Sequence, residues 1–463
     1  MNQRLKRLGV LGLATLSLSA GAQQRHEFSA RQAAAYAMKN SVLVKNALVD
    51  VQIQEQTNRE ITAAAFPQIN ASTATAYNPN VTTQTFPNFI GAATYGVLEK
   101  EGVSGTNGPI KMPADLGYIQ AQFGTKFNNS LGLDLQQLLF EGQVFVGLQA
   151  RATSMQFVRK NVEVTEETIK ANVYKIYYQL AAGRNQLNII DANIARTQKL
   201  ADDTRKMYEN GFAERLSIDV VSVQLTNLQT QRQKVVNGIE NGYLGLKYLM
   251  GMPVRDTLIL TDSVTYDDIR SGVLDATLYN YDDRKEFQYA ELGRQMNEFN
   301  VKRYKLTYFP TVALASNYTR LRQSNKFGFD GPWFPSSQVG LRISVPLFDG
   351  FARAARVQRA KLQLQQTENR MEDLKQSIDR EVQQAINDYS SALVSLDAQK
   401  RNMELAEKVY NQTKKKYEIG TGSTTEINDA DVNLRTAQTN YTDALYSAII
   451  AKIDFLKATG KLQ

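Results

Sequence analysis

Residues 351–416 constrain the fold more than any other feature, because this stretch of 66 residues contains neither proline nor glycine. From Ile378 to Tyr417, mostly apolar or small residues recur at alternating spacings of four and three. The spacing averages 3.5 residues, which is the period of a coiled coil. We therefore expect one helix about 100 Å long, at 1.5 Å per residue, well beyond the usual globular length. Tyr389 and Tyr410 fall on the same stripe, so we expect them to pack rather than to bind a ligand.

The same order of landmarks occurs twice along the chain. LFEG precedes YENG by 69 residues, and LFDG precedes YEIG by 70. From that point onward the two halves align without gaps at an offset of 209 residues, which indicates an internal repeat. The matching segments are Phe66–Tyr77 and Phe309–Tyr318, Leu139–Gly142 and Leu347–Gly350, and Tyr208–Gly211 and Tyr417–Gly420.

The repeat predicts one plan for each half: a helix, a strand, a loop, a second strand, a long helix, a tight turn and a return helix. The first repeat spans residues 23–251, an irregular linker spans 252–282, and the second repeat spans 283–463. The shorter helices are expected at about 29–65, 216–250 and 283–308, the strands at about 66–78, 118–140, 309–320 and 336–348, and the tip turns at 208–213 and 417–422.

The N-terminus predicts export from the cytoplasm. Residues 1–22 combine three basic residues, a short apolar core and a small-residue cleavage site, as a secretory signal peptide does. The core is too short to span a bilayer, and no other stretch holds ~18 consecutive apolar residues.

Composition excludes several classes of function. The chain has no cysteine, and its one histidine, His26, leaves little room for metal sites or histidine-based catalysis. The net charge of +8 is diffuse, without the clustered basic and aromatic residues of a nucleic-acid surface. We find no Ser/His/Asp set, phosphate loop or metal cluster in the sequence. We therefore expect no enzyme activity, no cofactor and no nucleic-acid partner.

Two of the expected strands alternate strongly between apolar and polar residues. The alternation runs from Ile119 for about 17 residues, roughly 55 Å of strand, and recurs from Val339 to Leu347. A soluble sheet packed on one face fits this pattern, and so does a membrane barrel with its apolar face toward lipid. Glycine and lysine on the polar face, together with export, favour the barrel.

Four strands are too few to close a membrane barrel, so several chains must build it together. The segments 78–117 and 321–335 read as long loops, whereas the strands pass directly into helices at the other end. This asymmetry is typical of outer-membrane barrels and places the loops outside.

This organisation resembles the TolC family of outer-membrane channel proteins over essentially the whole exported chain. The resemblance implies a homotrimer with a twelve-stranded barrel in the outer membrane of a Gram-negative bacterium and a tunnel of long helices in the periplasm. It also implies a passive exit duct for efflux or type I secretion, which works with a periplasmic adaptor protein and an inner-membrane pump. The joints between barrel and tunnel would then lie at Phe66, Pro67, Gly142, Phe309, Pro310 and Gly350.

The second tip turn carries the strongest candidates for a gate. Glu426 and Asp429 are three residues apart on one helix face, so a ring of protomers would bring them into a cation-favouring collar. The resemblance implies that both belong to the acidic ring of the closed gate, and that Tyr417 helps to hold that gate. In the first half Ser217 stands at the position equivalent to Glu426, and Asp219 nearby is a further gate candidate, with an acid of the first helical turn as the alternative. A capping box at Ser423 is the alternative explanation for Glu426.

The two turns are also candidates for contact with the adaptor. The alternative is that their glycines serve only to form turns with positive φ. The resemblance further implies a basic residue where this chain has glycine at position 422, which puts the usual latch in doubt. The candidate contact residues are Gly211, Phe212, Ala213, Gly420, Thr421 and Gly422.

Two other classes of protein share part of the pattern. A periplasmic coiled-coil protein similar to an adaptor would explain the helical hairpins but not four lipid-type strands. A substrate-specific porin would explain the strands but not helices of about 100 Å. Membrane fractionation and single-channel conductance distinguish these three classes.

Overall fold

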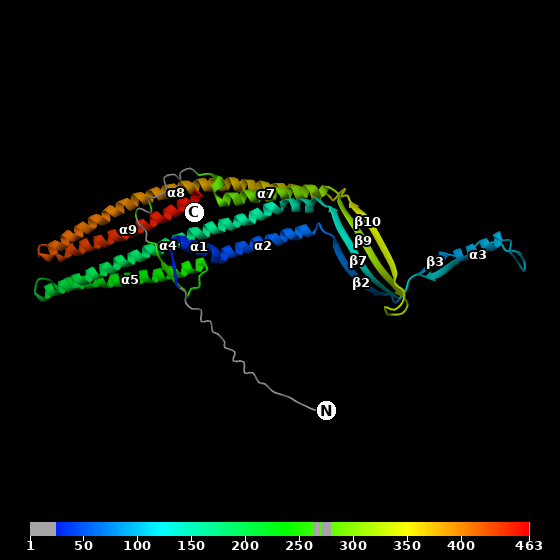
Figure 1. Cartoon of the computed structure of the whole chain (residues 1–463), viewed down its shortest axis with the longest axis horizontal. Helices are drawn as coiled ribbons and strands as arrows, with labels where there is room; N and C mark the ends of the chain where they lie inside the picture. The colour runs from blue at the N-terminus through cyan, green and yellow to red at the C-terminus, as the bar shows by residue number, and fades with distance from the viewer. Residues whose placement is uncertain (1–24, 263–265, 267–268, 270–278, 463) are drawn as a thin grey trace, which may run out of the picture. The chain divides into compact units, whose positions relative to one another are not determined.

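A computed structural model describes residues 25–262, 266, 269 and 279–462 (Figure 1). The expected signal peptide at 1–22 and much of the expected linker at 252–282 lie outside the described residues. The chain divides into two compact units. The first comprises Met1–Gln54, Thr153–Met296 and Gln365–Gln463, and the second comprises Glu55–Ala152 and Asn297–Leu364.

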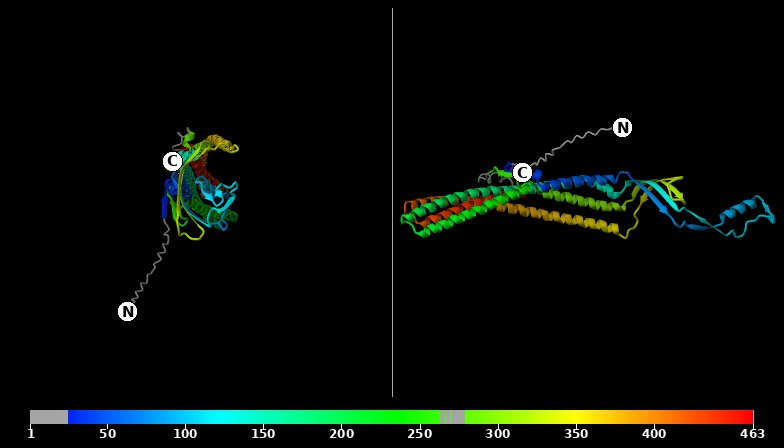
Figure 2. Two further views of the ribbon diagram at one scale, coloured as in Figure 1. Left: turned by 90° about the vertical axis from the view of Figure 1, so that its right-hand side faces the viewer. Right: turned by 90° about the horizontal axis from the view of Figure 1, so that it is seen from below.

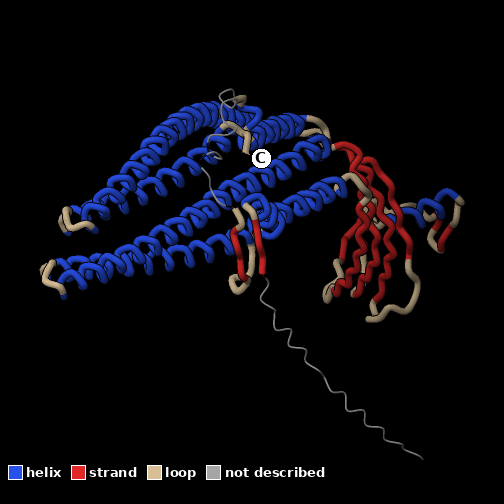
Figure 3. Tube along the Cα trace, turned by 60° about the vertical axis from the view of Figure 1, so that its left-hand side comes forward, coloured by secondary structure: helices blue, strands red, loops and turns tan. Residues whose placement is uncertain are grey.

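Long helices dominate the fold, as the coiled-coil spacing predicts. Two of them are continuous over 68 and 67 residues, and each is followed by a tight turn and a return helix (Figures 1 and 3). We call α4 with α5 the first hairpin and α8 with α9 the second hairpin. Their bounds are α4 (Gly142–Glu209), α5 (Arg215–Met250), α8 (Ala352–Glu418) and α9 (Thr424–Ala458).

Apolar side chains from both hairpins form the core of the first unit. Tyr177, Ile378 and Leu396 are among the largest fully buried side chains. The tyrosines expected to pack do so: Tyr389 and Tyr410 are both buried. The Tyr389 hydroxyl donates to the carbonyl oxygen of Ile269 at 2.7 Å, which satisfies its polar group inside the core.

The helix expected at about 29–65 is divided in two at Ser41. The structure has α1 (Ala30–Asn40), which begins with a capping box at Ser29, and then α2 (Val42–Ala63). The left-handed C-cap of α5, Gly251, packs against this break, and a Cβ there would lie 2.3 Å from the Asn40 carbonyl oxygen. The sequence around Ser41 contains no proline or glycine that would predict this break. The glycine that packs against it, Gly251, lies about 210 residues further along the chain.

Two short elements complete the first unit. Strand β1 (Arg25–Phe28) pairs in parallel with β8 (Thr257–Leu260), a pairing that the repeat did not predict. The helix expected at about 283–308 is α7 (Lys285–Lys305), between the 3₁₀ turns η1 (Tyr281–Asp283) and η2 (Leu306–Tyr308), and it runs on into the second unit.

The second unit contains an antiparallel four-stranded sheet in the order β10-β9-β7-β2 (Figure 3). The register gathers Leu133, Leu135, Leu314, Val339 and Leu341 on one face, and Asp134, Gln136, Asn317, Gln338 and Arg342 on the other. One face is thus apolar and the other polar. The strands are β2 (Gln68–Tyr77), β7 (Phe127–Phe140), β9 (Thr311–Ser324) and β10 (Phe334–Ser344).

The strand bounds differ from the expected ones at three places. The strand expected at 118–140 is interrupted before β7, where Gly124 has a φ of +126°. Strand β9 runs on to Ser324, and β10 ends at Ser344, before Pro346. Glycine and proline therefore set two of these limits locally.

The segment expected to be an irregular loop at 78–117 is folded. We call residues 78–126 the arm, and its base is closed where the Asn78 amide donates to the Lys126 carbonyl oxygen at 2.7 Å. Its elements are β3 (Thr83–Pro87), α3 (Phe89–Lys100), β4 (Ser104–Gly105), β5 (Gly108–Pro109) and β6 (Tyr118–Gln122).

Within the part of the chain that the structure describes, no helix combines the length and apolarity needed to cross a bilayer.

Candidate functional site

The tip turns are held by the glycines that their sequences predict. Gly211 and Gly420 have φ values of +80° and +77°, in the left-handed region that ends helices. The Phe212 amide donates to the Met207 carbonyl oxygen at 2.8 Å, and the Thr421 amide donates to that of Lys416 at 3.0 Å. Side chains add to this closure: Nδ2 of Asn210 donates to the Lys206 carbonyl oxygen at 2.7 Å, and the Thr421 hydroxyl donates to that of Lys416 at 3.2 Å.

The first turn exposes a large apolar side chain. Phe212 is 81% exposed at the end of the first hairpin, between Gly211 and the half-buried Ala213. The Phe212 ring is therefore accessible to a partner at the end of the first hairpin.

The second turn explains why glycine stands at position 422. A Cβ at Gly422 would lie 3.0 Å from the Tyr417 backbone nitrogen and 3.2 Å from the carbonyl carbon of Lys416. The turn crosses so close to the end of α8 that a side chain there would crowd the backbone. The basic residue that the resemblance implies at this position is therefore replaced by one that lets the turn close tightly.

Tyr417 lies between the two hairpins. Its side chain is 7% exposed and packs with Tyr410, Ile427 and Leu434, against Leu200 of the first hairpin. Its hydroxyl shares a hydrogen bond of 3.4 Å with the hydroxyl of Thr204 on α4. Tyr417 therefore fastens the end of α8 to α4 by apolar contact and one weak polar bond.

Glu426 and Asp429 both lie on the exposed side of α9. Glu426 completes a capping box, in which the Ser423 hydroxyl accepts from the Glu426 amide at 3.2 Å. The Glu426 carboxylate accepts in return from the Ser423 amide at 3.4 Å. The alternative explanation for Glu426 is therefore present in the structure. Asp429 remains exposed one turn further on, and Asp219 is exposed on α5 of the first hairpin.

A third carboxylate, Asp431, lies near the same turn, and sequence reasoning missed it. Asp431 is 2% exposed and faces the first hairpin, where its Oδ1 lies 3.4 Å from Nε of Arg196. Its Oδ2 lies 3.0 Å from Nη2 of Arg435, one turn along α9. The Arg196 guanidinium also stacks 5.0 Å from the centre of the Tyr410 ring. Figure 2 shows α9 running beside the first hairpin at this place.

Electrostatics at Asp431 combine opposing effects. Burial raises the pKa of Asp431 above its ordinary value, although the guanidiniums of Arg435 and Arg196 act to lower it. Removing a carboxylate from water costs more here than the two arginines return. The ionised carboxylate of Asp431 therefore adds little stability where the two hairpins meet.

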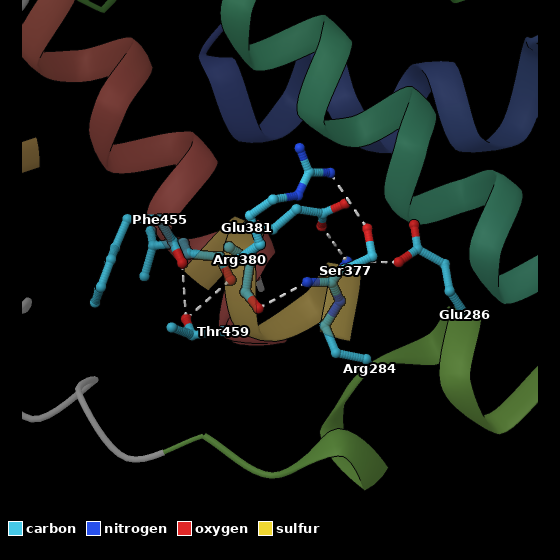
Figure 4. A network of polar contacts seen from close by, with 9 residues as sticks. Arg284, Glu286, Ser377, Arg380, Glu381, Phe455 and Thr459 are labelled. Carbon is cyan, nitrogen blue, oxygen red and sulfur yellow. Dashed lines mark hydrogen bonds and ion pairs between the residues drawn. The ribbon is translucent and has the colours of Figure 1, made fainter. Parts of the chain in front are cut away.

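The C-terminal end of α9 is held by Arg284 (Figure 4). This buried guanidinium donates to the carbonyl oxygen of Ala458, at the end of α9, at 2.8 Å. It also pairs with Glu286 at 2.6 Å and with Glu381 of α8 at 3.0 Å. Arg284 thus joins α7, α8 and α9. Its charge gave no signal in the sequence, because two of its partners, Glu381 and Ala458, come from distant segments.

The six expected joint residues lie at strand and helix ends of the second unit. Phe66 and Phe309 are exposed, and each stands with its proline just before β2 or β9. Gly142 begins α4, and a Cβ there would lie 2.5 Å from both the Cβ and the carbonyl oxygen of Leu306. Gly350 instead has a φ of +65° with open space around it. The two matching glycines therefore meet different physical requirements. Pro67 and Pro310 are the remaining two joint residues.

Groups that could hold a metal ion, meaning three or more His, Cys, Asp or Glu side chains together, are absent from the described residues.

Comparison with known proteins gives consistent results. Residues 282–461 match the model of the family described as "Outer membrane efflux protein". The outer membrane protein TolC of Vibrio cholerae serotype O1 is 19% identical over 72% of this chain and 77% of its own length. The proteases secretion protein PrtF of Dickeya chrysanthemi is 18% identical over 71% of this chain and 72% of its own length. A crystal structure of CusC superposes with a TM-score of 0.74 at 17% identity, over 93% of this chain and 92% of that chain.

Proposed function

Since the chain belongs to the outer membrane efflux protein family and is an efflux or secretion channel of the Gram-negative outer membrane, we propose that it is the passive exit duct of a tripartite export system. The duct would carry small molecules or proteins across the outer membrane. It would receive them from an inner-membrane pump through a periplasmic adaptor.

One observation carries this proposal: a single chain joins two long helical hairpins to a sheet that is open at both edges. The sheet ends at β2 on one side and at β10 on the other. On its apolar face Val339, Leu341 and Ile343 are all exposed. Unpaired strand edges are not tolerated in lipid, so the sheet needs further copies to close. Three copies with four strands each give the proposed twelve-stranded barrel.

We place the gate at the second tip turn. Asp429 and Glu426 would form its acidic ring, with Asp219 nearby, and Tyr417 would hold α8 against α4. The exposed acids at the start of α9 and the buried contact of Tyr417 support this assignment. The turns around Phe212 and Thr421 would contact the adaptor, which the exposed ring of Phe212 supports.

Membrane fractionation tests the channel directly. The protein should stay in the membrane pellet after a carbonate wash and run as a trimer in detergent. Release by carbonate would favour a periplasmic adaptor-like protein and would refute the proposal.

Single-channel conductance tests the gate. Asp429→Ala should change the conductance and reduce the preference of the closed pore for cations, because three carboxylates leave the constriction. Asp443→Ala is a matched control, since Asp443 is also exposed on α9 but lies about four turns away. Equal conductance in the two variants would show that Asp429 does not line the gate.

A further inference from the structure

The apolar face of the four-stranded sheet carries one exposed arginine. In the register, Arg320 of β9 lies between Leu131 of β7 and Pro335 of β10. Because side chains alternate along a strand, Arg320 is on the same face as Leu133 and Val339. Leu131 and Val339 are themselves exposed. Arg320 therefore belongs to the surface that faces lipid in the proposed barrel.

The position of Arg320 along β9 corresponds to the outer edge of an apolar band. Val312, Leu314 and Tyr318 precede it on the same face. Arg320 is eight residues from Val312, ~26 Å along the strand, or ~20 Å in height if strands tilt by about 40°. Exposed Val345 lies two residues beyond the partner of Val312 and adds ~5 Å. The sum matches the ~25 Å height of the apolar band of a membrane barrel.

Beyond Arg320, the turn between β9 and β10 covers this face. Arg322, the next residue of β9 on the face, is 7% exposed and donates to the carbonyl oxygens of Gly328 at 2.5 Å and Asp330 at 2.6 Å. Nδ2 of Asn129, beside it on β7, also donates to the Gly328 carbonyl oxygen, at 3.1 Å. Arg320 is therefore the outermost exposed residue of β9 on the apolar face.

The charge of Arg320 is not balanced within the sheet. The positions of β2, β7, β9 and β10 on the apolar face hold no aspartate or glutamate. Nε of Arg320 donates to the Tyr318 hydroxyl at 3.0 Å, a neutral partner one step along β9. Among the described residues, no bond occupies the two terminal nitrogens of Arg320. The Tyr318 bond thus orients a charged guanidinium and leaves its outer edge open.

The chemistry of this position favours a phosphate group as the ligand. A cation on the lipid face of a barrel is costly at the middle of the bilayer and tolerated near the interface, where a long side chain reaches the headgroups. A guanidinium with two free terminal nitrogens binds a phosphate through two parallel, charge-assisted hydrogen bonds. The exposed Leu131 and Tyr318 beside Arg320 provide apolar surface for the rest of a lipid.

We propose that Arg320 binds the phosphate group of a lipid in the outer leaflet, with Tyr318 as a positioning residue. The site lies within one chain, so each copy would hold one lipid. This inference rests on the proposed barrel and adds a lipid-binding site to its outer surface.

A lipid that carries phosphate on its headgroup tests the site. The purified protein in detergent is titrated with diphosphoryl lipid A in the presence of EDTA, and bound lipid is counted by native mass spectrometry. The unmodified protein should bind one lipid for each copy. Arg320→Gln removes the charge and should weaken binding about tenfold to a hundredfold, the usual effect of losing hydrogen bonds between charged groups. Lipid A stripped of its phosphates should bind both proteins equally weakly.

Two further variants distinguish binding from positioning. Arg342→Gln is the matched control, because Arg342 is exposed on β10 but lies on the polar face, and it should bind as the unmodified protein does. Tyr318→Phe keeps the ring and removes the hydroxyl, so it should weaken binding less than Arg320→Gln. Adding Tyr318→Phe to Arg320→Gln should cause no further loss, since the hydroxyl acts only through the guanidinium.

Several results would overturn the inference. They are equal affinity in Arg320→Gln and the unmodified protein, an equal loss in Arg342→Gln, and tight binding of the lipid without phosphates. Displacement of the lipid by millimolar inorganic phosphate would also overturn the lipid as the ligand. Each is decisive only for a trimer that stays in the membrane after a carbonate wash. Release by carbonate would instead refute the proposed channel, so the two failures are distinguishable.

Discussion

Replacing Gly142 by alanine should destabilise the second unit through one close approach. The added Cβ would lie 2.5 Å from both the Cβ and the carbonyl oxygen of Leu306. That is about 1 Å inside the optimal separation of 3.5–4.0 Å between carbon atoms. Overpacking of this kind costs about 1–3 kcal/mol, and a backbone oxygen cannot rotate away, so we take the upper end. Alanine regains up to ~1 kcal/mol of helix propensity, which leaves a net loss of about 2 kcal/mol.

A second glycine provides the matched control. Gly245 lies inside α5, and a Cβ there would meet nothing within 4 Å. Gly245→Ala should therefore stabilise the protein by up to ~1 kcal/mol. Thermal unfolding of the purified protein in detergent, followed by circular dichroism at one fixed scan rate, measures the difference. Gly142→Ala should unfold roughly 2–5 °C lower than the unmodified chain, and Gly245→Ala no lower than it.

Substitutions at Leu306 then identify the clashing atoms. Leu306→Ala keeps the Cβ, so it should not rescue Gly142→Ala. Leu306→Gly removes the Cβ but leaves the carbonyl oxygen, so it should rescue Gly142→Ala only in part, measured as a coupling between the two changes. The reasoning would be refuted if Gly142→Ala unfolded at the same temperature as Gly245→Ala. It would also be refuted if adding Leu306→Ala returned the unfolding temperature of Gly142→Ala to that of the unmodified chain.

Three further predictions concern other sites. Gly350→Ala should destabilise by about 1–2 kcal/mol, because its φ of +65° is strained for alanine although space is free, and Leu306→Gly should not rescue it in the same unfolding assay. Burial raises the pKa of Asp431, so protonation of this carboxyl group stabilises the folded hairpins at low pH, and this stabilisation is lost as pH rises through the raised pKa. The resistance of the hairpin tips to protease should fall over that pH range. Asp431→Asn should remove the pH dependence. Hydrogen bonding to Asp379 raises the pKa of Tyr279 to about 12, so the anchoring of this segment to α8 is complete below pH 10 and lost as pH rises toward 12. Asp379 also accepts from Tyr281 and raises its pKa, so ultraviolet titration should show two late-ionising tyrosines fewer in Asp379→Asn, and an unchanged titration would contradict that assignment.

The long helices could be predicted from sequence because their signal is local and extended. The spacing from Ile378 to Tyr417 specifies one stripe, and the glycines at 211 and 420 mark where each hairpin turns. The break at Ser41 could not be predicted, because Gly251 meets it from another part of the chain. The folded arm was missed for a different reason: its helix and strands are too short to show a clear helical or alternating pattern of apolar residues.

The candidate site was only partly accessible from sequence. Glu426 and Asp429 were chosen as candidates because acids beside a glycine turn stand out, and their place in the gate stays a prediction. Asp431 looks like one more acid of the same helix start, and its burial depends on Arg196 of the other hairpin. Likewise the matching glycines at 142 and 350 look equivalent in sequence, yet one avoids Leu306 and the other permits a left-handed turn.

The two open edges of the sheet also set an order of events during biogenesis. Strands β2 and β10 contain 10 and 11 residues. In an antiparallel edge every second residue directs its N–H and C=O outward, which leaves roughly ten unpaired groups along each edge. At several kcal/mol for each group in hydrocarbon, a lone chain would face a barrier of tens of kcal/mol to insertion. In the proposed trimer, copies of this chain must therefore associate before or while they enter the bilayer, so the rate of insertion should rise steeply with the concentration of unassembled chains.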